Sequence, residues 1–136
     1  MRILLVEDEP VSRLALTKIL ATQNEHQTTV AENGASAWDL LDDPGRSFDV
    51  VFLDLGLPKL DGFELLQRIR ATPLLKSLEV VVCTASNDRA TVVKAAQHGA
   101  RHYIVKPCTP EVVFAKLRQL QPAGASSGER LLGGAR

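Results

Sequence analysis

Charged and hydroxyl side chains stand at the ends of four short apolar segments of this chain. Three are carboxylates, one is a hydroxyl and one is an ammonium. If the segments are strands of one parallel sheet, their carboxyl ends meet at one edge, where open α/β sheets bind ligands. The sequence therefore predicts that these side chains converge in one cleft. In chain order they are Glu7, Asp8, Asp54, Thr84 and Lys106.

Three carboxylates in one cleft repel one another and destabilise a fold unless a cation lies among them. The candidate donors are hard oxygen atoms, with no histidine or cysteine among them, and such donors favour Mg²⁺ or Mn²⁺ over Zn²⁺. A carboxylate that attacks phosphorus also needs its charge partly neutralised and the phosphoryl oxygens stabilised. A metal ion, Lys106 and Thr84 can supply these functions. The pattern therefore favours phosphoryl transfer to a carboxylate.

The apolar segments that end in these residues have the composition of strands. They are continuous rather than alternating, which predicts that both faces are covered, as in a parallel sheet between two helical layers. A fifth strand is expected at residues 26–31, where the pattern is weaker. The four clearer segments are residues 3–6, 50–53, 80–83 and 103–105.

Helical spacing of apolar residues separates the strands, for example at residues 65–69 and 113–120. Pro10 and Pro110 fit the first position of a helix, and Gly99 fits a helix end. Strands and helices therefore alternate as five βα units. This order predicts an α/β fold with a doubly wound sheet of five parallel strands.

Length and composition indicate one domain in a reducing compartment. The 136 residues include 16 basic and 16 acidic side chains, so no net charge attracts nucleic acid or an anionic membrane. We expect neither as a direct partner. Cys83 and Cys108 are too far apart in the sequence for a Cys-x-x-Cys pair, and the acidic residues after the apolar start argue against a signal peptide. These features predict a cytoplasmic protein.

The chain also resembles a known family over residues 1–121, the receiver domains of two-component response regulators. Residues 54–62 resemble the phosphoacceptor segment of that family. Cys108 stands where the family often has phenylalanine. We expect residues 122–136, rich in Ala, Gly and Ser, to form a flexible tail or the start of a linker. The other matching pairs and residues are Glu7-Asp8, Thr84-Ala85, Tyr103 and Lys106-Pro107.

The resemblance implies a flavodoxin-like receiver fold in which Asp54 is phosphorylated. It implies that Asp8 and Asp54 bind Mg²⁺ directly, that Glu7 does so mainly through water, and that the Gly56 carbonyl completes the protein ligands. Mn²⁺ is a possible substitute. Such a domain catalyses only its own phosphorylation and dephosphorylation, so no enzyme acting on an external substrate is expected.

The resemblance also implies a switch. Lys106 would bridge the acceptor carboxylate and then the phosphoryl oxygen, through a loop with a cis bond to Pro107. Thr84 would move inward on phosphorylation and Tyr103 would follow. The surface formed by the fourth helix, the fifth strand and the fifth helix would change in consequence.

The implied partners are a histidine kinase or histidine phosphotransfer protein, and a downstream protein or a covalently linked output domain missing from this chain. The domain would be a monomer or a weak dimer. The alternative within the family is a degenerate receiver that binds proteins without phosphorylation. A phosphohydrolase of the haloacid dehalogenase type is disfavoured, because Gly56 stands where that chemistry needs a second carboxylate.

Overall fold

Parallel strands form one sheet at the centre of the computed structural model, which describes residues 1–23, 26–55, 61–85 and 89–120. Within these residues the sheet has five strands in the order β2-β1-β3-β4-β5, all parallel. The expected fold is confirmed, including the weaker strand at residues 26–31. The strands are β1 (Arg2–Val6), β2 (Gln27–Ala31), β3 (Val50–Asp54), β4 (Glu79–Thr84) and β5 (His102–Val105).

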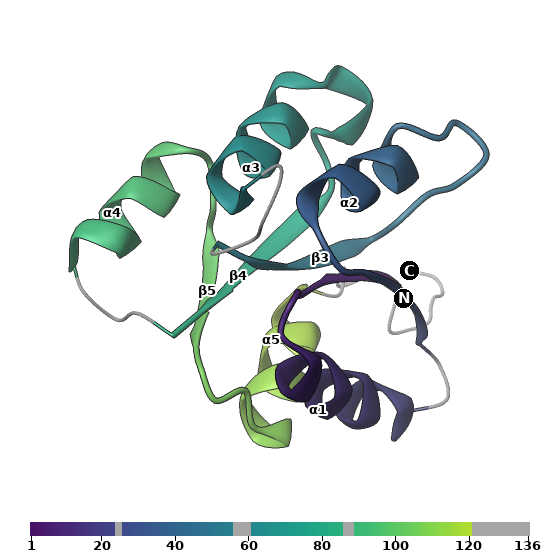
Figure 1. Cartoon of the computed structure of the whole chain (residues 1–136), viewed down its shortest axis with the longest axis vertical. Helices are drawn as coiled ribbons and strands as arrows, with labels where there is room; N and C mark the ends of the chain where they lie inside the picture. The colour runs from purple at the N-terminus through teal and green to yellow at the C-terminus, as the bar shows by residue number, and fades with distance from the viewer. Residues whose placement is uncertain (24–25, 56–60, 86–88, 121–136) are drawn as a thin grey trace, which may run out of the picture.

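Helices cover both faces of the sheet, as Figure 1 shows. The helices α2, α3 and α4 lie on one face, and α1 and α5 lie on the other. Strands and helices alternate along the chain, as expected for a doubly wound sheet. The helices are α1 (Pro10–Ala21), α2 (Gly34–Leu41), α3 (Gly62–Ala71), α4 (Arg89–Gln97) and α5 (Pro110–Leu120), with a 3₁₀ turn, η1 (Pro73–Leu75), after α3.

The apolar strand segments supply two separate core layers. Alternate residues of one strand point to opposite faces, so in β1 Leu4 packs with α2 and α3 while Ile3 packs with α1 and α5. β3 repeats the pattern with Leu53 and Phe52, and all four side chains are completely buried. Burial on both faces explains why these segments read as continuous apolar runs rather than as alternating ones.

Local signals define where several helices begin and end. Pro10 and Pro110 are the first residues of α1 and α5, as predicted. The Thr109 hydroxyl accepts a hydrogen bond from the backbone N–H of Val112 at 3.3 Å and so caps the first turn of α5. Gly99 has a φ of 98°, a left-handed conformation that ends α4 as expected.

The strand order reverses its direction between β1 and β3. From β1 the chain continues to β2 on one side, whereas β3, β4 and β5 extend the sheet on the other. In the register of β1 and β3, Val6 lies opposite Leu53. Glu7 and Asp54 therefore follow at the same level, at the topological switch point where α/β sheets of this order bind ligands.

Two expectations fall outside the described residues, namely the predicted tail at 122–136 and the predicted metal ligand Gly56. Among the residues that the structure does describe, no helix is both long and apolar enough to cross a bilayer.

Gly62, the first residue of α3, lies against the end of β3, so we predict that Gly62→Ala destabilises the fold. A Cβ atom there would lie 2.6 Å from the backbone oxygen of Asp54 and would also meet the Cα atom of Leu55. Backbone atoms cannot move away as a flexible side chain can. We expect the free energy of unfolding to fall by about 2 kcal/mol, measured by urea denaturation.

Gly45→Ala is the matched control. A Cβ atom at Gly45 has its nearest neighbour in a side-chain oxygen of Asp43, at 3.3 Å, and this position is exposed. Its stability should therefore stay within about 0.5 kcal/mol of the wild type. Equal stability of the two variants would contradict the close approach of α3 to β3.

Candidate functional site

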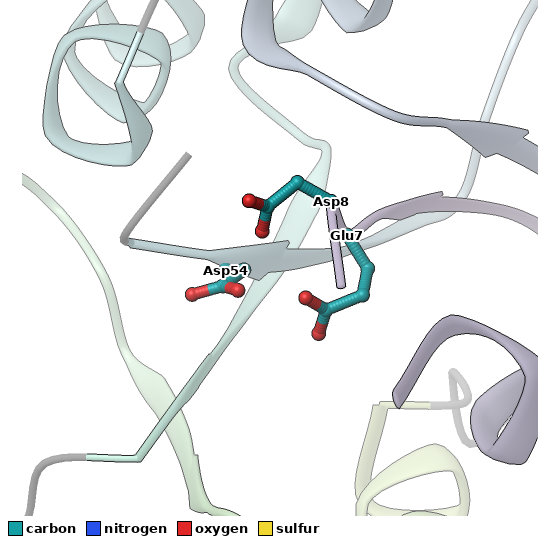
Figure 2. Close-up of side chains that lie close together, drawn as sticks. All are labelled: Glu7, Asp8 and Asp54. Carbon is teal, nitrogen blue, oxygen red and sulfur yellow. The ribbon is translucent and has the colours of Figure 1, made fainter. Parts of the chain in front are cut away.

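Three carboxylates meet at the carboxyl edge of the sheet. Glu7 and Asp8 follow β1, Asp54 ends β3, and oxygen atoms from all three lie within 4.8 Å of one another. Figure 2 shows the three side chains gathered around one space. Glu7 is only 1% exposed and the side chain of Asp54 is 14% exposed, whereas Asp8 is exposed. The predicted convergence of these side chains is confirmed.

Lys106 brings a positive charge to this cluster from the loop after β5. Its Nζ atom lies 2.6 Å from Oε1 of Glu7 and 3.2 Å from Oδ2 of Asp54. Its backbone N–H donates to the carbonyl oxygen of Thr84 at 2.8 Å, which holds the start of the loop against β4. The bond between Lys106 and Pro107 is cis, as expected.

The backbone around the acidic pair is held by contacts that no motif indicated. The guanidinium of Arg13, on α1, donates to the carbonyl oxygens of Glu7 and Asp8, each at 3.3 Å. The backbone N–H of Glu9 donates to Oε2 of Glu7 at 3.2 Å. These bonds orient Glu7 toward Lys106 and leave Asp8 on the open side of the cluster.

Burial and crowding change the protonation of the cluster. Burial raises the pKa of Glu7 to about 7, and the hydrogen bond and negative charge of Asp54 add to this effect against the opposing contact with Lys106. Burial by itself lowers the pKa of Lys106, but the contacts with Glu7 and Asp54 outweigh burial and raise it. Lys106 therefore stays positively charged at neutral pH. Its single positive charge does not balance the two negative charges of Glu7 and Asp54 when both carboxylates are ionised.

The donor set fits a hard divalent cation. Oxygen atoms from Glu7, Asp8 and Asp54 are close enough to share one ion, and the negative charge of Asp54 adds to burial in raising the pKa of Glu7. Carboxylate oxygens are the donors that Mg²⁺ and Mn²⁺ prefer. These residues could therefore hold the predicted metal ion.

Thr84 and Tyr103, the predicted switch residues, lie on neighbouring strands. Thr84 is buried at the end of β4, opposite Val105 of β5. Tyr103 lies opposite Val82, and its partly buried ring packs against the core layer under α2 and α3. Tyr103 thus lies on the sheet face that carries α4, and Thr84 lies at the sheet edge that carries the site.

Cys83 and Cys108 come together beside the site, although their separation in the sequence gave no reason to pair them. The neighbouring thiol of Cys108, together with burial, raises the pKa of Cys83 well above its usual value. The neighbouring thiol of Cys83 lowers the pKa of Cys108, against the effect of burial. No pattern in the sequence indicates this pair, because it depends on β4 and the loop after β5 being neighbours in space.

The raised pKa of Glu7 predicts that stability without metal falls as the pH rises. Native Glu7 keeps its proton up to about pH 7, whereas the unfolded side chain loses it near its usual 4.5. The native state therefore binds more protons between these values, and stability is lost across that window. In EDTA, we expect the free energy of unfolding to decrease by up to about 3 kcal/mol between about pH 5 and about pH 8.

Glu7→Gln is the matched variant, because an amide of the same shape does not titrate. Urea denaturation should show a flatter pH dependence for this variant than for the wild type. Mg²⁺ at about one hundred times its Kd should add about 2.7 kcal/mol to the wild type at the upper end of the range. Identical pH profiles for the two proteins would contradict the assignment to Glu7.

The sequence of this chain matches a known protein family. Residues 3–118 match the family described as the response regulator receiver domain. The chemotaxis protein CheY-3 of Vibrio cholerae is 35% identical over 120 residues, which cover 88% of this chain and 91% of that protein.

Solved structures agree with the sequence match. The Mn(2+)-bound form of response regulator Rcp1 has a TM-score of 0.75 at 29% identity, over 88% of this chain and 90% of that one. The phosphorylated cyanobacterial phytochrome response regulator RcpA has a TM-score of 0.76 at 27% identity, over 88% and 89% of the two chains. Through the match over residues 3–118 and the likeness of its fold, this chain belongs to the response regulator receiver domains, the phosphorylation-dependent signalling switches of two-component systems.

Proposed function

We propose that this chain accepts a phosphoryl group on Asp54 from a phosphohistidine of a histidine kinase or histidine phosphotransfer protein. The observation that carries the proposal is the contact of Lys106 Nζ with both Asp54 and Glu7, at 3.2 and 2.6 Å, beside the third carboxylate of Asp8. An acceptor carboxylate needs such compensation, because a second anion must approach it. The phosphorylated relative RcpA supports the same chemistry.

In the proposed reaction, an oxygen of Asp54 attacks the phosphorus atom of the donor. The new O–P bond forms as the P–N bond to the donor imidazole breaks, and the imidazole leaves with the electron pair and is protonated. Lys106, which contacts Asp54 Oδ2 in the resting state, would then contact a phosphoryl oxygen. The hydroxyl of Thr84, at the adjacent strand end, would donate to another.

Asp8 and Asp54 would hold Mg²⁺ directly, Glu7 would do so through water, and the Gly56 carbonyl, outside the described residues, would complete the set. When bound, the ion supplies charge neutralisation to the carboxylates and to the incoming phosphoryl oxygens. The Mn(2+)-bound relative Rcp1 supports a divalent ion and the possible use of Mn²⁺.

The proposed output is a changed surface over α4, β5 and α5. Thr84 and Tyr103 connect the site with this region, because they lie on the two strands beside α4 and α5. Apolar side chains are already exposed there, which suits a protein partner. They are Val92 and Val93 on α4, Val105 on β5 and Val112 on α5.

Receiver domains are signalling switches rather than enzymes that act on an external substrate. For this chain we propose a receiver domain over residues 1–121, active as a monomer or weak dimer in the cytoplasm. Its partners would be the phosphoryl donor and a downstream protein or linked output domain. Because the described acidic, hydroxyl and lysine residues are all present at the site, a degenerate receiver is left as an outcome of the test.

We predict that acetyl phosphate with Mg²⁺ adds a single phosphoryl group to the wild-type chain and none to Asp54→Asn. Asn lacks the nucleophilic charge, but its similar shape should leave the fold intact. Intact-mass spectrometry measures the adduct, and EDTA should abolish it. Asp39→Asn, at an exposed carboxylate on α2, is the matched control and should be labelled like the wild type.

Two results would overturn this proposal. Labelling of Asp54→Asn would move the phosphoacceptor to another residue. No adduct on folded wild-type protein would instead favour a degenerate receiver that acts only by binding proteins.

A further inference from the structure

Two thiols that are distant in the sequence meet next to the site. Cys83 is the residue before Thr84 on β4, and Cys108 lies two residues after Lys106 in the loop to α5. Cys83 belongs to the apolar layer under α1 and α5 and Cys108 packs against that layer. The hydrogen bond from the Lys106 N–H to the Thr84 carbonyl at 2.8 Å joins the two segments that carry them. No other cysteine occurs in the 136-residue chain, so each thiol has one possible intramolecular partner.

The two thiols differ in their access to solvent. Cys83 is 2% exposed, whereas Cys108 is half-buried. Cys108 lines an open cavity of about 160 Å³ between α1 and the loop after β5, together with Val11, Ala15 and Pro107. A small oxidant can therefore reach Cys108 through this cavity, whereas Cys83 is almost completely removed from solvent.

We propose that Cys108 and Cys83 form an oxidisable pair that closes to an intramolecular disulfide in the presence of a hydroperoxide. In the first step, the sulfur of Cys108 attacks a peroxide oxygen, the O–O bond breaks, and Cys108 becomes a sulfenic acid as water or an alcohol leaves. In the second step, the sulfur of Cys83 attacks the Cys108 sulfur, the S–S bond forms, and the sulfenic oxygen leaves as water with the Cys83 proton. The two thiols lose two electrons to the peroxide.

Strand pairing and a loop hydrogen bond bring the two cysteine-bearing segments side by side. A disulfide needs Cα atoms about 4.4–6.8 Å apart and side chains that face each other. Cys83 lies opposite Ile104 in the pairing of β4 and β5, and neighbouring strands are about 4.8 Å apart. The hydrogen bond from Lys106 N–H to the Thr84 carbonyl keeps the loop against β4.

The disulfide would tie the strand end that carries Thr84 to the loop that carries Lys106. Phosphorylation, as proposed above, requires both residues to adjust around the phosphoryl group. This consequence rests on the proposed function, whereas the disulfide itself does not. We expect the oxidised chain to be labelled at Asp54 about fivefold more slowly or worse than the reduced chain.

The test treats the full reduced chain with a small excess of hydrogen peroxide and follows its intact mass. We expect a monomer that has lost two hydrogen atoms, a peptide map that joins Cys83 to Cys108, and full reversal by dithiothreitol. In Cys83→Ala, Cys108 should instead be trapped as a sulfenic acid by a dimedone reagent. In Cys108→Ser, buried Cys83 should remain reduced under the same conditions.

Controls separate this proposal from the phosphorylation proposal. Asp54→Asn should form the disulfide as readily as the wild type, because Asp54 takes no part in it. If acetyl phosphate does not label the reduced protein, the proposed function is wrong, but the proposed thiol pair is unaffected. If the peroxide-treated wild type keeps both thiols, or forms disulfides only between chains, the proposed pair is wrong. If the disulfide forms but the labelling rate of Asp54 is unchanged, its link to phosphorylation is wrong.

Discussion

The contact of Lys106 with Glu7 and Asp54 is the interaction on which the site depends. Glu7 is almost completely removed from water, and a buried carboxylate is costly unless it is paired or keeps its proton. Pairing with Lys106 requires that the ends of β1, β3 and β5 lie at one edge of the sheet. The arrangement thus joins the stability of the fold to the charge of the site, and a divalent cation would relieve the repulsion that Lys106 leaves.

Several elements contact the backbone and the side chains of the site residues. Gly62 allows α3 to begin against the backbone of Asp54, and Arg13 on α1 holds the carbonyl groups of the acidic pair. Lys106 is held at its backbone by Thr84 and at its ammonium by the carboxylates. A change in charge at Asp54 therefore meets groups from several elements at once, which is what a phosphorylation switch needs.

Much of this architecture could be predicted because the signals are local. The continuous apolar runs of β1, β3 and β4 report burial on both faces, and Pro10, Pro110 and Gly99 mark helix ends by their own backbone preferences. The strand at Gln27–Ala31 was harder to predict, because β2 is an edge strand with mostly exposed or partly exposed side chains. A half-exposed edge strand tolerates polar residues, so β2 lacks the continuous apolar run that marks the central strands.

The sequence alone determined the fold class and which charged residues meet at the sheet edge, since strand ends in a parallel sheet share an edge and these residues stand at those ends. Only the tertiary structure decided how these groups interact. The raised pKa of Glu7, the support from Arg13 and the meeting of Cys83 with Cys108 all arise between residues that are close in space, by packing of side chains from different elements. Periodicity and motif spacing describe neighbours along the chain, whereas burial, charge compensation and thiol pairing depend on which surfaces the packed helices and strands bring together.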